Sequence, residues 1–178
     1  MELPGSKAHY SEELVCLPHL SINYQRPREG SRERLFDRSA IFFCPQSLFK
    51  IPPSQDRYFA RLLIEVPKAS LRLMAHDNQN VTNAFVTRIS AVFSAHGISF
   101  SDRVKIYPRL NRQKFLKLYD ECTLVLDSFK WSGGNTNLEA LAAGVPVVTL
   151  PGTLMRSRHA FAMLTILNLP DLIAKDEE

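Results

Sequence analysis

A short polar stretch at residues 132–136, Ser-Gly-Gly-Asn-Thr, stands between an apolar strand-like run and an apolar pattern with helical spacing. Glycines permit positive φ angles and let a ligand approach the backbone, and the start of a helix offers free N–H groups that favour phosphate. One interpretation is a phosphate cradle made by Gly133, Gly134, Asn135 and Thr136. The other is an ordinary glycine turn with Asn135 or Thr136 as the N-cap. The stretch is neither a Walker loop nor a GxGxxG motif, so both interpretations stay open.

Glu139 follows in the first turn of the same predicted helix. A carboxylate near a helix N-terminus is favoured by about 0.3–1 kcal/mol, which is one sufficient reason for its presence. The functional interpretation is an acceptor for ribose hydroxyls, since one carboxylate can accept hydrogen bonds from two vicinal hydroxyls. Nucleotide-binding α/β sheets commonly use an acid in this way.

Lys50 and Gln46 lie in the loop after another apolar run, at residues 39–45. Apolar neighbours flank Lys50, and a lysine held in this way at the carboxyl end of a strand is a candidate phosphate contact. The alternative is a surface lysine on a loop bounded by prolines.

A third loop carries Arg109 and Arg112. These arginines are either solvated positive charge or neighbours of a base or phosphate. The exposed backbone of Arg109 and Leu110 could pair with a nucleobase edge. No Ser/His/Asp elbow, HExxH or paired-carboxylate motif appears, so the sequence indicates a ligand platform and leaves the catalytic residues unidentified.

Short apolar runs alternate with amphipathic segments from residue 39 onward, which predicts an α/β fold with a doubly wound, mostly parallel, Rossmann-like sheet. The expected strands are 39–45, 69–76, 103–108, 122–128, 146–151 and, as a short last one, 171–174. The expected helices are 54–67 with Ser54 as N-cap, 80–97 closed by Gly97, 111–121, 135–144 closed by Gly144, and 155–168. Such sheets bind ligands at the carboxyl ends of their strands, so the loops described above should meet at one edge.

Two parts are expected in the 178 residues: a linker or extension at 1–38 and the sheet domain at 39–178. With 45% hydrophobic and 22% charged residues the composition is globular, and a net charge of +4 is too small to indicate nucleic-acid binding. The three cysteines show no CxxC pattern, so we expect no disulfide and no metal site, with Cys44 and Cys122 buried. Without an apparent signal peptide or membrane-spanning run, a cytoplasmic location is expected.

Two blocks, "FFCPQSLFKIPP" and "LDSFKWSGGNTNLEALAAGVPVVTLPGTLMRSRHA", resemble the carboxyl-terminal half of the O-linked N-acetylglucosamine transferase / SPINDLY-like glycosyltransferases. The resemblance runs from about residue 18 to the end and is closest to bacterial members that carry tetratricopeptide repeats. It implies one Rossmann-like half of a GT-B fold, a UDP-sugar donor, a protein Ser or Thr acceptor, and no metal or other cofactor.

The same resemblance implies a role for each candidate residue. Lys50 would contact the donor diphosphate with Gln46 or Ser47 beside it, and the backbone of Arg109 and Leu110 would read uracil. Asn135 and Thr136 would lie over the phosphates, and Glu139 would hold the ribose.

Phe115 and Gly134 stand where animal and other family members have histidine. The resemblance makes UDP-N-acetylglucosamine the default donor, and these two departures leave other sugars or a GDP-fucose-type donor open. The family's repeats and amino-terminal half are missing, and the chain stops where another helix would begin. We therefore expect a donor-binding fragment that is inactive without that half. The alternatives are a GT-B enzyme acting on a lipid or saccharide, and a non-catalytic interaction domain.

Overall fold

A five-stranded, all-parallel sheet with the order β3-β2-β1-β4-β5 forms the centre of the protein. The computed structural model describes residues 1–20, 22–25 and 39–176. The strands are β1 Ile41–Cys44, β2 Ser70–Met74, β3 Val104–Tyr107, β4 Leu124–Leu126 and β5 Val147–Val148. The chain moves outward from β1 to β3 and then returns to the other side of β1, so the strand order switches between β1 and β4. The predicted fold class is confirmed.

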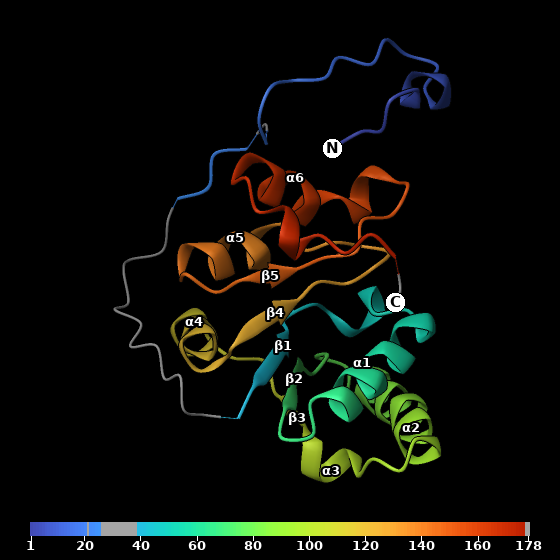
Figure 1. The fold of residues 1–178 in the computed structure, drawn as a ribbon, viewed down its shortest axis with the longest axis vertical. Coiled ribbons are helices and arrows are strands. Elements are labelled where there is room, and N and C mark those ends of the chain that lie inside the picture. The colour runs from blue at the N-terminus through green and yellow to red at the C-terminus, as the bar shows by residue number, and fades with distance from the viewer. Residues whose placement is uncertain (21, 26–38, 177–178) are drawn as a thin grey trace.

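Helices cover both faces of the sheet (Figure 1). They are α1 Pro53–Glu65, α2 Gln79–Ala95, α3 Phe100–Arg103, α4 Arg112–Glu121, α5 Asn135–Ala142 and α6 His159–Ile166. The helices α1 and α2 pack on one face, and α4, α5 and α6 pack on the other.

Four of the five strands, β1 to β4, therefore contribute to two apolar clusters. Phe42 lies in the cluster with α1 and α2, while the next residue, Phe43, lies in the cluster with α4 and α5. Successive strand side chains point to opposite faces, so a strand buried on both faces is apolar without alternation. This is why residues 41–44 read as a continuous Ile-Phe-Phe-Cys run.

Several boundaries differ from the predictions. Ser54 is not an N-cap, because α1 begins one residue earlier at Pro53, whose fixed φ suits the first helical position. The short α3 was not predicted. The expected last strand at 171–174 is mostly the 3₁₀ turn Pro170–Leu172, and only Ile173 bridges to Thr149 of the β5 side.

Two predicted helix ends are confirmed by glycines in the left-handed region. Gly97 after α2 has a φ of 70°, and Gly144 after α5 has a φ of 71°. Behind α2, the N–H groups of Gly97 and Ile98 bond back to the carbonyls of Ser94 and Phe93. This pair of bonds satisfies carbonyls at the end of the helix, and glycine adopts the required φ without steric cost.

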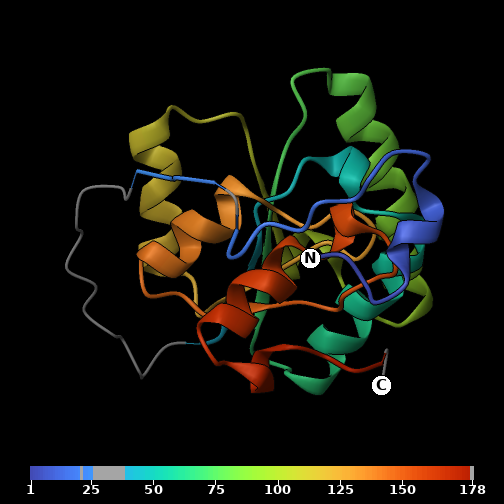
Figure 2. The same ribbon diagram turned by 90° about the horizontal axis from the view of Figure 1, so that it is seen from above.

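The amino-terminal segment runs past the α6 end of the domain and contains the 3₁₀ turn Ser6–His9 (Figures 1 and 2). Arg158 ties it to the domain by donating from Nε to the carbonyl of Met1 at 2.8 Å. Part of the predicted linker, residue 21 and residues 26–38, lies outside the described residues. Within the described ranges, no helix is both long and apolar enough to cross a bilayer.

The three cysteines should differ sharply in reactivity, because Cys16 is exposed whereas Cys44 and Cys122 are buried. Burial raises the pKa of the Cys44 thiol to about 12, so almost none of it is the reactive thiolate at pH 8. We expect iodoacetamide at pH 8 to modify the native chain once, at Cys16, and all three sites after denaturation. Peptide mass spectrometry measures this, and rapid native labelling of Cys44 would contradict the packing described above.

Candidate functional site

The loops after β1 and β4 meet at the carboxyl edge of the sheet, because these two strands are neighbours. Gln46 joins the two loops, donating from Nε2 to Thr136 Oγ1 at 2.8 Å. Its side chain is only 2% exposed, so Gln46 fastens the β1 loop to the start of α5. Open α/β sheets place ligands at this switch point, and the predicted candidates on these loops are brought together there.

Asp127, directly after β4, organises the second loop. Its buried carboxylate accepts four hydrogen bonds, from Ser132 Oγ at 2.5 Å, Gly133 N at 2.8 Å, Thr149 Oγ1 at 2.9 Å and Asn137 Nδ2 at 3.0 Å. These donors belong to the loop, to α5 and to the end of β5. A buried carboxylate requires such donors, and here they hold three elements in one arrangement.

Gly133 is needed because of close packing, and neither Gly133 nor Gly134 adopts the positive φ that glycine permits. A Cβ on Gly133 would lie 2.2 Å from Gln46 Nε2 and 2.5 Å from Thr136 Oγ1. Gly134 has a φ of −88°, and a Cβ there would meet no atom within 4 Å. The first glycine lets the two loops touch, whereas the second leaves open space in front of α5.

The start of α5 has no side-chain cap. Gly134 is the N-cap, while Asn135 and Thr136 are already inside the helix, so their predicted alternative role as N-caps is wrong. The backbone N–H groups of Asn135 and Thr136 make no hydrogen bond with any residue in the described ranges. The Asn135 side chain is exposed. Free N–H groups and the helix dipole make this a favourable place for an anion.

Lys50 ends the 3₁₀ turn Leu48–Lys50 and reaches toward the β4 loop. Its Nζ lies 5.6 Å from the centre of the Trp131 ring, within the range of a cation–π contact. Partial burial lowers the pKa of Lys50, and the negative charge of Asp127 opposes that shift. Lys50 is therefore held at the edge of the sheet and is not a freely extended surface lysine. Ser47, on the same loop, is exposed.

The loop after β3 presents both a side chain and free backbone. Arg109 forms an ion pair with Asp77, so part of its positive charge is neutralised. The backbone of Arg109 and Leu110 makes no hydrogen bond with the described residues and remains available to a ligand. The ring of Phe115 packs against Phe43, with 6.1 Å between the ring centres, which draws it partly into the core.

Glu139 does not lie in the first turn of its helix, as predicted, but is the fifth residue of α5. It is only 5% exposed, and two neighbouring side chains compensate its buried carboxylate. Arg112, the first residue of α4, approaches Glu139 Oε1 with Nη1 at 3.0 Å. Tyr24, from the amino-terminal segment, donates its hydroxyl to the same oxygen at 2.5 Å. Ion pairing and hydrogen bonding, and not the helix dipole, therefore account for the position of this acid.

Sequence reasoning missed Asp127 and Tyr24. An acid directly after a buried strand was a visible signal for Asp127, but its donors Asn137 and Thr149 come from 10 and 22 residues away. For Tyr24 there was no local signal, because its partner Glu139 is 115 residues away.

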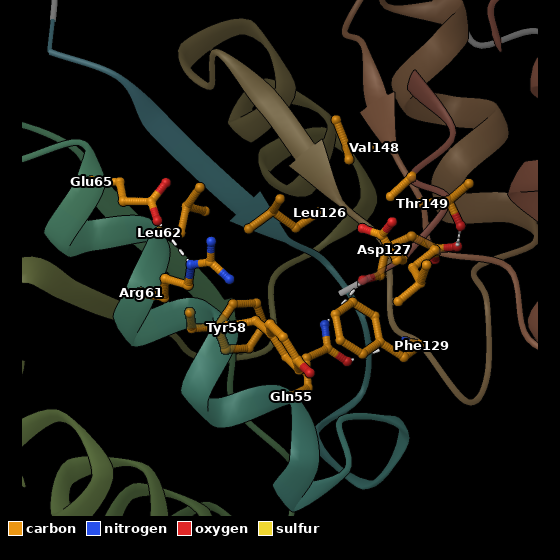
Figure 3. A pocket seen from close by; sticks show the side chains of 14 residues that line it. Gln55, Tyr58, Arg61, Leu62, Glu65, Leu126, Asp127, Phe129, Val148 and Thr149 are labelled. Atoms are coloured by element: carbon orange, nitrogen blue, oxygen red, sulfur yellow. Dashed lines mark hydrogen bonds and ion pairs between the residues drawn. The ribbon is translucent and has the colours of Figure 1, made fainter. Parts of the chain in front are cut away.

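A pocket of about 250 Å³ lies between α1 and the ends of β4 and β5, and Asp127 and Thr149 are among the residues that line it (Figure 3). Its lining is largely apolar and includes Tyr58, Leu62, Phe129 and Val148, and none of the predicted site residues lines it. The predicted site is instead an open edge formed by loops, which is the form expected when a second domain completes a cleft.

Residues 29–178 match the family described as glycosyl transferase family 41. The chain belongs to this family. It is 28% identical over 180 residues to the probable UDP-N-acetylglucosamine–peptide N-acetylglucosaminyltransferase SPINDLY of Arabidopsis thaliana, covering 98% of this chain and 19% of that protein. It is 30% identical over 140 residues to the UDP-N-acetylglucosamine–peptide N-acetylglucosaminyltransferase of Caenorhabditis elegans, covering 78% of this chain and 12% of that protein.

Solved structures agree with this membership. A mutant of the O-GlcNAc transferase of Thermobaculum terrenum superposes with a TM-score of 0.82 and 29% identity, covering 98% of this chain and 33% of that chain. A UDP-GlcNAc 2-epimerase from Neisseria meningitidis, at 18% identity and a TM-score of 0.51, shares the fold. The domain is one Rossmann-like half of a GT-B glycosyltransferase, as the resemblance implied.

The two adjacent glycines offer a matched pair of substitutions. Gly133→Ala should lower the free energy of unfolding by about 1–3 kcal/mol, since the new methyl group must displace Gln46 or Thr136. Gly134→Ala should lower it by less, about 0.5–1 kcal/mol, because its Cβ meets open space and only the N-cap preference for glycine is lost. Urea unfolding of both variants measures this, and equal effects would contradict the close approach at Gly133.

Asp127→Asn should be among the most destabilising single-atom changes in the domain. The amide nitrogen would face donors in place of an acceptor, so we expect a loss of about 2–4 kcal/mol. Asp120→Asn, on the exposed side of α4, is the control and should stay within about 0.5 kcal/mol. Urea unfolding gives both values, and a small loss for Asp127→Asn would mean that the four bonds do not hold the loop.

Proposed function

We propose that this domain binds the donor nucleotide of a glycosyltransferase that moves N-acetylglucosamine from UDP-N-acetylglucosamine to Ser or Thr side chains of proteins. The observation that carries the proposal is that Lys50, on the β1 loop, and the uncapped start of α5, the helix that also carries Glu139, lie at the strand switch. The names of the relatives support this donor and a peptide acceptor. The chain spans 19% and 12% of the two curated relatives and 33% of the matched bacterial structure, so the activity would belong to a longer protein.

The proposed site assigns one part of the donor to each group. Lys50 and the N–H groups of Asn135 and Thr136 would hold the diphosphate, with Ser47 beside it. Gln46 and Gly133 would keep the two loops close enough for this. Glu139 would accept from the ribose, and the free backbone of Arg109 and Leu110 would pair with uracil.

The chemistry proposed for this donor is an inverting displacement. The acceptor hydroxyl oxygen forms a bond to the anomeric carbon while the bond from that carbon to the β-phosphate oxygen breaks. The electron pair and the negative charge go to UDP, and the hydroxyl proton goes to a base. Fixed cations and helix N–H groups stabilise the departing charge, so we propose that no metal or other cofactor is needed.

The setting of the proposed enzyme follows from the same reasoning. We propose a bacterial, cytoplasmic protein whose partners are a nucleotide-sugar and, through the rest of the enzyme, a protein acceptor. We do not propose nucleic acid or a membrane as partners, given the weak net charge of +4 and the absence of a basic stripe in the sequence.

Calorimetric titration with UDP tests this function, with GDP and ADP as comparison nucleotides and EDTA present throughout. We expect selective binding of UDP by the unaltered chain. Lys50→Ala should weaken it by roughly 10–100-fold, because a charge-assisted contact contributes about 1.5–3 kcal/mol. Lys130→Ala, an exposed lysine on the β4 loop, is the matched control and should bind UDP as the unaltered chain does.

Three outcomes would count against parts of the proposal. Failure to bind any nucleotide would reject a preformed donor site in this domain. Equal binding of UDP, GDP and ADP would reject uracil recognition by the β3 loop. Unchanged affinity in Lys50→Ala would remove that lysine from the site.

A further inference from the structure

Tyr24 is a residue of the amino-terminal segment that reaches the proposed nucleotide site from outside the sheet domain. It precedes residues 29–178, the part that matches the family. Its half-buried side chain contacts α4 and α5 through a compact triangle of polar groups. The corners of that triangle are Tyr24, Arg112 and Glu139.

All three edges of the triangle are within bonding distance. The Tyr24 hydroxyl donates to Glu139 Oε1 at 2.5 Å and accepts from Arg112 Nη2 at 3.0 Å. Arg112 Nη1 also lies 3.0 Å from Glu139 Oε1. Both contacts to the acid therefore use the same oxygen, and Oε2 has no hydrogen-bond partner among the described residues.

This arrangement is not the one that Arg112 and Glu139 would adopt as an isolated pair. A guanidinium and a carboxylate prefer two parallel hydrogen bonds, which occupy both carboxylate oxygens. Here Arg112 Nη2 donates to the Tyr24 hydroxyl, and that hydroxyl donates to Oε1. With Nη2 bonded to Tyr24, both contacts to Glu139 fall on Oε1, and Oε2 has no partner among the described residues.

We infer that Tyr24 is a positioning residue for the nucleotide: its hydroxyl orients Glu139 so that Oε2 can accept hydrogen bonds from the vicinal ribose hydroxyls. The inference rests on the proposed function, since it concerns the residue proposed to hold the ribose. It extends the donor site to a segment outside the sheet domain. Tyr24 acts through Glu139 and is not assigned a contact with the reacting atoms.

The protonation states fit this role. Burial and the hydrogen bond to Glu139 raise the pKa of the Tyr24 hydroxyl, so it remains a donor at neutral pH. The hydrogen bond to Tyr24 and the charge of Glu139 raise the pKa of Arg112, which therefore stays positively charged. Tyr24 and Arg112 therefore both keep their protons at neutral pH and act as donors to Glu139.

Tyr24→Phe removes the hydroxyl and keeps the ring, and two ligands separate its effects. We expect about tenfold weaker binding of UDP, and less than a twofold change for 2′,3′-dideoxy-UDP, which lacks both hydroxyls that Glu139 would hold. In the Glu139→Gln background, Tyr24→Phe should change UDP affinity by less than twofold, because the carboxylate that Tyr24 orients is no longer present. Calorimetric titration of the chain measures all of these affinities.

Tyr10→Phe is the matched control. Tyr10 lies in the same amino-terminal segment and also donates to a carboxylate, Glu2 Oε1, at 2.7 Å, but it is exposed and that acid is not part of the site. Its removal should leave both affinities unchanged. The thermal unfolding temperature of each variant, measured in parallel, shows whether the domain remains folded.

The outcomes separate this inference from the function on which it rests. If the unaltered chain binds no UDP, the proposed function and the inference fall together. If the unaltered chain binds UDP, three results for Tyr24→Phe would overturn only the role of Tyr24. These are an unchanged UDP affinity, an equal loss of affinity for UDP and dideoxy-UDP, and a lower unfolding temperature without selectivity between the two ligands. Tighter UDP binding by Tyr24→Phe would also overturn it, because the hydroxyl would then be blocking Glu139.

Discussion

A buried carboxylate, that of Asp127, is the constraint on which the arrangement of the site depends. An uncompensated charge in this position would be strongly unfavourable, so the surrounding chain must supply donors. Four donors do so, and they come from the β4 loop, from α5 and from the end of β5. Satisfying one acid thus fixes the direction in which α5 starts, and the start of α5 is where the uncapped N–H groups lie.

The close contact between the β1 and β4 loops follows from this arrangement. Asp127 draws the Gly133 backbone inward, where only a residue without a Cβ leaves space for Gln46. Gln46 then bonds to Thr136, and Lys50 follows on the same β1 loop. Asp127, Gly133 and Gln46 are not assigned a part in the chemical step. Together they hold the β1 loop, and with it Lys50, beside the start of α5.

The amino-terminal segment belongs to this picture as much as the sheet does. Arg158 binds the carbonyl of Met1, and Tyr24 binds Glu139, so two points far apart in the segment are attached to the domain. The exposed apolar side chains Val15 and Leu17 show that the segment between these points is not packed into the core. The segment is anchored by polar contacts, and one of these anchors lies in the proposed nucleotide site.

Local patterns in the sequence determined the elements of this protein. The alternation of apolar runs with amphipathic segments predicted the parallel α/β sheet, and the glycines at 97 and 144 predicted the ends of two helices. Both signals are properties of residues that are neighbours in the chain. They also predicted that the loops after the strands would meet, since the carboxyl ends of parallel strands share one edge. Only the tertiary structure decided that Gly133 serves close packing, that Asp127 gathers donors from three elements, and that Tyr24 reaches Glu139 across 115 residues. Those contacts join groups far apart in the chain, and no short-range pattern encodes which distant donor meets which acceptor.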